Sequence, residues 1–286
     1  MKNSLRTLYV SDLDGTLLNT DSRISKRTSE IITGLTDRGA LITVATARTP
    51  ATVVPLMSHT RTSVPAIVMT GAATWCRKSN RFITTHIMSH RDAAHISQTM
   101  AGCGISPFFY TLPRHKRHDC CPALEVYHNA YRPTHAEQKF IDERIDMPLK
   151  KFYLNTPLPE NASDRIMLIF GMAPIERIKE AEMLLKASTP CYVSAYCDIF
   201  DTSTGLIEVY APGVSKASAV KSLAEQTKAE RIVAFGDNLN DLPMLEAADL
   251  AVAVSNARPE VKDKADIIID ANHTDAVARF IAEDFG

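Results

Sequence analysis

The chain has 286 residues, with 32 basic and 33 acidic side chains that give a formal net charge of -1. Hydrophobic residues make up 45% and charged residues 23%, which is typical of a globular protein and excludes a disordered or fibrous chain. A nearly neutral chain has no overall basic field, so we expect neither a nucleic-acid nor a membrane partner.

The amino-terminal part predicts short strands that alternate with helices. The expected elements are a strand at 8–12, a helix at 25–39, a strand at 40–46, a short helix at 49–60 and a strand at 65–71. Ser25 suits the N-cap of the first helix, and Gly39 suits the left-handed position after its last turn. The first three elements therefore form a β-α-β unit.

The middle of the chain interrupts this rhythm. Turn-rich stretches separate alternating segments that predict strands, at 124–128, 165–170 and 206–211. We expect residues 83–210 to form a second α/β domain with antiparallel sheet content. It would be inserted into a core made of residues 1–82 and 211–286.

The carboxyl-terminal part returns to the alternating pattern. The expected elements are helices at 216–227, 240–248, 259–265 and 274–285, and strands at 231–237, 249–255 and 265–270. Short apolar strands between helices favour a doubly wound, mostly parallel sheet that is covered on both faces. The sequence therefore predicts an α/β fold with a Rossmann-like core.

No apolar run reaches the roughly 18 residues of a membrane span, and the amino-terminal run is too short for a signal peptide. We therefore expect a cytoplasmic protein. The six cysteines lack CxxC spacing, so we expect reduced thiols rather than a disulfide framework.

Polar side chains gather at the predicted carboxyl ends of the core strands. They are Asp12 and Asp14, Thr46 with Arg48, Lys216 at a helix start, and Asp237, Asn240 and Asp241 in GDNLND. Two carboxylates on one face of a strand end resist burial unless a cation or a shared proton intervenes. Because ligand sites of open parallel sheets lie at this edge, the set predicts phosphoryl transfer assisted by a divalent cation.

Each of these motifs alone has an ordinary structural explanation. An isolated DxDG is often a turn with solvated acids, and Asp241 alone would be read as a helix N-cap with Pro243 close behind it. Lys216 alone would be a surface lysine, and Thr46 alone a cap at a strand end. Their order and common location favour a functional site, because the structural explanation would need several coincidences.

The same ordered residues resemble the haloacid dehalogenase superfamily. DLDGTLL, the strand-end Thr46, Lys216 and GDNLND carry this resemblance, and AVAVSNARPEVKDKAD is similar to the tail of the Cof-type branch. The resemblance covers both ends of the chain, about half its length. The middle segment is similar to the α/β cap domain of that branch only in position and size.

The resemblance implies a role for each matching residue. The catalytic residues would be Asp12 as nucleophile, Asp14 as general acid and base, Thr46 and Lys216. The ligands of Mg²⁺ would be Asp12, Asp14 through its backbone carbonyl, Asp237 and Asp241. The phosphate-binding residues would be Gly15, Thr46, Ala47, Arg48, Lys216 and Asn240.

Several positions depart from the Cof-type pattern. Ala47 and Ala217 replace glycines, Thr70 replaces an asparagine and Ser255 replaces a glycine. The first two add a methyl group near backbone that would approach phosphate, so they bear on the shape of the pocket. In the stretch 114–121, RHKRHDCC, the spacing fits no standard zinc site, and we expect a basic turn that attracts anionic substrates.

The expected function is that of a Mg²⁺-dependent phosphomonoester hydrolase that acts on a small phosphorylated metabolite through an aspartyl-phosphate. The resemblance puts sugar phosphates first, with flavin mononucleotide and pyridoxal phosphate next. A phosphomutase and a non-enzymatic phosphate-sensing module remain alternatives. We expect a monomer or weak homodimer.

Overall fold

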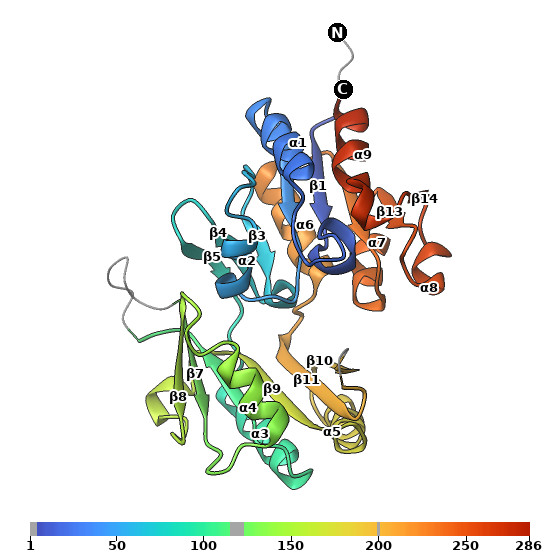
Figure 1. The fold of residues 1–286 in the computed structure, drawn as a ribbon. Coiled ribbons are helices and arrows are strands. Elements are labelled where there is room, and N and C mark those ends of the chain that lie inside the picture. The colour runs from blue at the N-terminus through green and yellow to red at the C-terminus, as the bar shows by residue number, and fades with distance from the viewer. Residues whose placement is uncertain (1–4, 115–122, 199–200) are drawn as a thin grey trace. The chain divides into compact units, whose positions relative to one another are not determined.

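The computed structural model describes residues 5–114, 123–198 and 201–286, and the chain divides into two compact units (Figure 1). The first unit contains residues 1–84 and 215–286, and the second contains residues 85–214. The boundaries lie slightly later in the chain than 82 and 210, the positions expected from the sequence. Strands continue past both positions, because β5 ends at Thr85 and β11 ends at Pro212.

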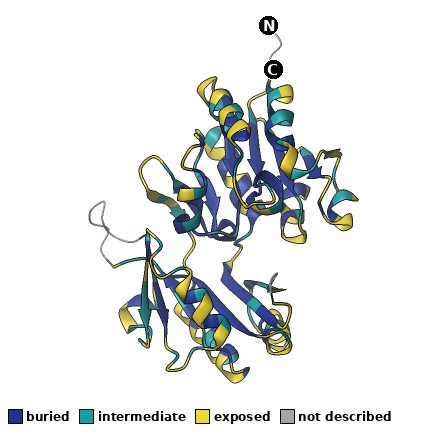
Figure 2. Ribbon diagram, in the orientation of Figure 1, coloured by how far each residue is buried: buried dark blue, intermediate teal, exposed yellow. Residues whose placement is uncertain are grey.

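A five-stranded parallel sheet organises the first unit, in the order β14-β13-β12-β1-β2. Its strands are β1 (Thr7–Ser11), β2 (Leu41–Val44), β12 (Arg231–Gly236), β13 (Leu250–Val254) and β14 (Ile267–Ile269). The strands are rich in buried aliphatic residues, and Figure 2 shows the interior of this unit as buried and the outer faces of its helices as exposed. Both faces of the sheet therefore need helical cover.

The order of the strands sets the position of a site. The chain passes from β1 to β2 in one direction, and its carboxyl-terminal strands extend from β1 in the other direction through β12. This is a topological switch point, where parallel sheets open a crevice at the carboxyl ends of the strands. The ends of β1 and β12 are neighbours there, since Ser11 pairs with Phe235.

Among its described residues, the first unit has six α-helices. They are α1 (Lys26–Asp37), α2 (Pro50–Leu56), α6 (Lys216–Thr227), α7 (Leu242–Glu246), α8 (Pro259–Lys262) and α9 (Ala276–Phe285). The Ser25 side chain caps α1 by accepting a hydrogen bond from Thr28 N, and Gly39 has a φ of 96° after the helix ends. Both expectations for this helix are confirmed.

A smaller antiparallel sheet adjoins the main sheet. It contains β3 (Ala66–Val68), β4 (Ala73–Cys76) and β5 (Arg81–Thr85), and a parallel bridge joins Ala45 to Ile67. Between β3 and β4, Met69, Thr70 and Gly71 have φ values of 52°, 56° and 96°. Only glycine adopts this region without strain, so two consecutive non-glycine residues there mark a strained turn. The turn abuts the start of α6, because a Cβ on Gly71 would lie 2.2 Å from Ser215 O.

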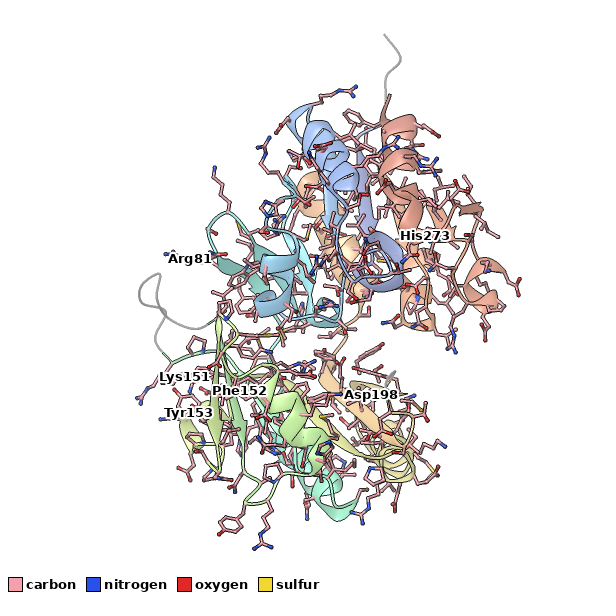
Figure 3. All side chains as sticks on the ribbon, in the orientation of Figure 1. Arg81, Lys151, Phe152, Tyr153, Asp198 and His273 are labelled. Carbon is pink, nitrogen blue, oxygen red and sulfur yellow. The ribbon has the colours of Figure 1, made fainter. Side chains whose placement is uncertain are left out.

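The second unit contains a six-stranded sheet in the order β10-β11-β9-β6-β7-β8. The strands are β6 (Phe108–Thr111), β7 (Leu124–His128), β8 (Lys150–Leu154), β9 (Ile166–Pro174), β10 (Cys191–Cys197) and β11 (Thr204–Pro212). The helices are α3 (His90–Gly102), α4 (His135–Asp142) and α5 (Ile175–Ser188). All neighbouring strands are antiparallel except β7 and β8, which α4 connects. Figure 3 labels Lys151, Phe152 and Tyr153 on β8, the edge strand.

The α/β architecture predicted from the sequence is confirmed, with a parallel core sheet and antiparallel content in the second unit. Among the described residues, no helix combines the length and apolar character needed to cross a membrane. The described cysteines, Cys76, Cys103, Cys191 and Cys197, are free thiols. The basic stretch expected at 114–121 lies outside the described residues from 115 onward.

Candidate active site

The chain turns sharply where β1 ends. Asp12 is extended, and the following turn, Leu13–Leu17, contains Gly15 with a φ of 77°. A Cβ on Gly15 would lie 2.3 Å from Oδ2 of Asp237, the residue that follows β12. Only a residue without a Cβ therefore fits beside the Asp237 carboxylate, which explains the glycine in the DxDG motif.

Lys216, the first residue of α6, connects two carboxylates. Its Nζ lies 2.6 Å from Asp12 Oδ1 and 2.7 Å from Asp241 Oδ1, and all three side chains are buried. The helix places the lysine because Ser215 caps it by accepting from Ser218 N. A buried ion pair of this kind needs the remaining polar atoms of its partners to be satisfied.

The second oxygen of Asp241 is satisfied by backbone. Oδ2 accepts hydrogen bonds from the amides of Asp237 and Asn238, each at 3.1 Å. This carboxylate approaches closely because Gly236 has no side chain, and a Cβ there would lie 2.6 Å from the Cβ of Asp241. Asp241 thus fixes both the loop after β12 and the ammonium group of Lys216.

The carboxylates of the cluster repel one another. Burial, followed by the charge of Asp241, raises the pKa of Asp12, although Lys216 acts in the opposite direction. Burial likewise raises the pKa of Asp237 to about 6. Burial alone would lower the pKa of Lys216, but the charges of Asp12 and Asp241 outweigh it and raise the pKa. The lysine is therefore a fixed cation among carboxylates that favour additional positive charge.

Three carboxylates are close enough to hold a metal ion. One oxygen each of Asp12, Asp237 and Asp241 can be chosen so that all three lie within 4.8 Å of one another. Thr16 orients one of these groups by donating a hydrogen bond to Asp237 Oδ1 at 2.8 Å. An all-oxygen donor set suits a hard divalent cation, so these residues fit a metal site.

Thr46 and Arg48 follow β2 beside this cluster. Thr46 is buried, and its Oγ1 accepts from the backbone amide of Arg48 at 3.2 Å. The Arg48 guanidinium binds both oxygens of Asp14, through Nε at 2.7 Å and Nη2 at 2.6 Å. The Asp14 side chain is half-exposed, unlike that of Asp12, so the two aspartates of the motif have different surroundings.

Two residues predicted to bind phosphate are less closely tied to the carboxylate cluster. Asn240 lies on the same turn as Asp241, but it is exposed, and among the described residues no hydrogen bond joins its side chain to the carboxylates. Ala47 is half-buried between Thr46 and Arg48.

One residue was missed in the sequence. Asn256, after β13, donates from Nδ2 to Gly15 O at 2.8 Å, while its Oδ1 accepts from Asn272 N. Its place at the end of a fourth core strand is the signal that would have found it.

Residues 9–281 match the sequence model of a family described as haloacid dehalogenase-like hydrolases. A putative phosphatase of Haemophilus influenzae is 28% identical over 280 residues, which are 96% of this chain and 97% of that protein. The 5-amino-6-(5-phospho-D-ribitylamino)uracil phosphatase YcsE of Bacillus subtilis is 28% identical over 276 residues, 96% of this chain and 94% of that protein.

A solved structure has the same fold. It is described as a sugar phosphatase of subclass IIB, and it superposes with a TM-score of 0.70 at 19% sequence identity. The match covers 97% of this chain and 98% of that chain. The similarity therefore extends over both units and not only over the core motifs.

Proposed function

We propose that this chain, which belongs to the haloacid dehalogenase-like hydrolases, is a Mg²⁺-dependent phosphatase that cleaves phosphomonoesters of small metabolites through an aspartyl-phosphate. The proposal depends chiefly on one observation, the 2.6 Å contact between Lys216 Nζ and Asp12 Oδ1 beside two further carboxylates. A carboxylate that faces a fixed cation can attack a phosphoryl group while the positive charge reduces the repulsion between the two anions.

Asp12 is the nucleophile of the proposed reaction. One oxygen of its carboxylate forms a bond to phosphorus as the bond from phosphorus to the leaving oxygen breaks. Lys216 holds Asp12 in place and pairs with the phosphoryl oxygens, and Thr46 donates a hydrogen bond to them. Water then attacks the aspartyl-phosphate, which releases inorganic phosphate and restores the carboxylate.

Asp14 moves the protons. Its carboxyl group gives a proton to the leaving oxygen in the first step and takes one from the attacking water in the second. The half-exposed position of Asp14 supports this role, since its side chain is not tied into the buried cluster that holds Asp12.

Asp12 and Asp237 would hold the metal, with the backbone carbonyl of Asp14, and Asp241 would support the site from behind. Asp241 is assigned the supporting role because both of its oxygens already accept hydrogen bonds. When bound, Mg²⁺ supplies positive charge that neutralises the phosphoryl oxygens.

The descriptions of two similar proteins support a substrate class. One curated relative is described as a phosphatase of a phosphorylated ribitylamino-uracil, and one structural neighbour as a sugar phosphatase. Both substrates are small molecules that carry a phosphate ester on a polyol or sugar. We propose that this chain acts on the same broad class.

The first test is the release of inorganic phosphate from a panel of sugar phosphates, flavin mononucleotide and pyridoxal phosphate. Wild type is compared with Asp12→Asn, in Mg²⁺ and in chelator. We expect release that requires both Mg²⁺ and Asp12, with a loss of at least about a thousandfold in the variant.

Other outcomes separate the alternatives. A folded Asp12→Asn protein with wild-type activity would refute the nucleophile. Isomerised products without free phosphate would identify a phosphomutase, and a phosphoenzyme that persists for hours would favour a sensing module.

A further inference from the structure

The side chains of Arg48 and Asp14 form a two-pronged ion pair. Nε and Nη2 of the guanidinium reach one carboxylate oxygen each, at 2.7 and 2.6 Å. The Asp14 side chain is 51% exposed and that of Arg48 is 29% exposed, so the carboxylate borders solvent and the guanidinium is largely covered. Such forks are specific for carboxylates and phosphates, and the same guanidinium geometry serves both.

The backbones on both sides of this pair are fixed. Arg48 N donates to Thr46 Oγ1, and Arg48 O accepts from Met69 N at 3.0 Å. On the other side, Asn256 holds the carbonyl of Gly15, directly after Asp14. The ion pair can therefore open by side-chain rotation alone, with no movement of the chain.

Arg48 also lies within electrostatic reach of the nucleophile. The pKa of Arg48 is raised first by its hydrogen bonds to Asp14, and the charge of Asp12 contributes as well. In the proposed reaction Thr46 donates a hydrogen bond to the phosphoryl group on Asp12, and the Thr46 hydroxyl contacts the backbone of Arg48. Such a group presents Arg48 with a second fork acceptor that carries more negative charge than a single carboxylate.

We propose that Arg48 is a positioning residue that exchanges partners, holding the Asp14 carboxylate when no phosphate is bound and releasing it when a phosphoryl group takes the guanidinium. The inference deepens the phosphatase proposal and depends on it for the role of Asp14. In the paired state both oxygens of Asp14 face Arg48. After the exchange the Asp14 carboxyl group is released and can rotate toward the leaving oxygen. This happens only when substrate is present.

The exchange predicts a competition that can be measured without catalysis. The probe is inorganic phosphate, titrated calorimetrically into the Mg²⁺-loaded full chain. Arg48→Ala should weaken phosphate binding, because the fork is lost. Asp14→Ala should strengthen it about fivefold, because Arg48 no longer has to leave a partner.

The double variant makes this test specific. In the Arg48→Ala background, Asp14→Ala removes a negative charge but no competitor, so the gain should fall below about twofold. Equal gains in the two backgrounds would overturn the exchange and leave only charge repulsion. An Arg48→Ala protein that binds phosphate as tightly as wild type would overturn it as well.

Kinetics provides a second readout. If phosphate binding frees Asp14, Arg48→Ala should raise KM at least about tenfold and leave kcat within about threefold, because Asp14 is then always unpaired. A large fall in kcat at unchanged KM would instead mean that Arg48 holds Asp14 in its reactive position, and would refute the exchange. Arg48→Lys keeps the charge but not the fork, and should recover only part of the phosphate affinity.

A second ion pair on the surface serves as a control for the general effect of deleting such a pair. Arg279 Nη2 lies 2.6 Å from Asp270 Oδ2 elsewhere in the same unit. Arg279→Ala and Asp270→Ala should leave phosphate affinity unchanged, singly and together. If wild type binds phosphate but hydrolyses no ester, the proposed function fails while the binding cycle still decides the exchange.

Discussion

Nζ of Lys216 lies 2.7 Å from Oδ1 of Asp241, and the two side chains are 1% and 0% exposed. The other oxygen of Asp241 accepts hydrogen bonds from two backbone amides of the loop after β12. One carboxylate therefore links the start of α6 to the end of a core strand. The same lysine reaches Asp12, so two buried carboxylates share one ammonium group.

Replacing this lysine should cost stability and activity together. In Lys216→Met the Asp12 and Asp241 carboxylates lose their common cation, and breaking a buried pair typically costs about 3–5 kcal/mol. We expect a loss of this size in the free energy of unfolding by urea, with turnover abolished. Lys221 is exposed on the same helix, so Lys221→Met should behave as wild type. Equal stability of the two variants would show that the buried pair contributes little.

Gly15 and Gly39 offer a matched pair of substitutions. Both have positive φ, at 77° and 96°, but only Gly15 faces a carboxylate, since nothing lies within 4 Å of a Cβ on Gly39. Either change to alanine should cost about 1 kcal/mol in backbone strain. Gly15→Ala should in addition displace Asp237, so Mg²⁺ affinity measured by titration should fall at least about tenfold. Unchanged affinity would mean that Asp237 does not hold the metal.

Asp237 should make the stability of the metal-free protein depend on pH. Its pKa is raised to about 6 from an ordinary 3.8, chiefly by burial. Between these values the folded state binds more protons than the unfolded state, so this group lowers the free energy of unfolding as pH rises from about 4 to 6. Urea unfolding in chelator should show that fall, and Asp237→Asn should remove part of it. Saturating Mg²⁺ should offset this fall in the free energy of unfolding. If Asp237→Asn shows the same fall as wild type, another group is responsible for it.

Lys150 should destabilise the second unit at neutral pH. Its side chain is buried, with Nζ 5.3 Å from the centre of the Tyr110 ring, and burial lowers its pKa to about 8. The protonated form is therefore penalised below pH 8, and stability should rise as pH increases from about 8 to 10.5. Lys150→Met should be more stable at pH 7, by up to about 3 kcal/mol, with a flatter profile. The control is Lys151→Met, at the exposed neighbouring residue that Figure 3 labels. If the two variants have the same dependence of stability on pH, Lys150 is not the group responsible.

The core could be predicted from the sequence because its signals are local. Strands such as β12 and β13 are short apolar runs between helices, and α1 carries its own cap and its own glycine. The hairpin of β4 and β5 was not predicted. Its strands are short and its outer strand is partly exposed, so neither alternation nor a continuous apolar run marks it.

The second unit was harder to predict for a different reason. Its sheet order, β10-β11-β9-β6-β7-β8, joins strands far apart in the chain, and α4 makes a parallel crossover between otherwise antiparallel neighbours. Nothing in the residues of one strand specifies such a partner.

The site shows the same division. The order of the motifs predicted that Asp12, Lys216 and Asp241 would meet, and they do. The roles assigned to them stay predictions. The pairing of Arg48 with Asp14 depends on where two side chains reach across neighbouring strand ends, and no spacing in the sequence encodes that.

β1 is synthesised early, but its neighbour β12 is synthesised late. The two pair in register from Thr7 with Arg231 to Ser11 with Phe235, whereas residues 85–214 form a continuous unit between them. During translation that inserted unit can complete its own sheet while one edge of β1 still has no partner strand. An unpaired apolar edge invites aggregation. We therefore expect nascent chains stalled before residue 231 to carry a folded insert beside an unfinished core, and to depend on chaperones until β12 emerges.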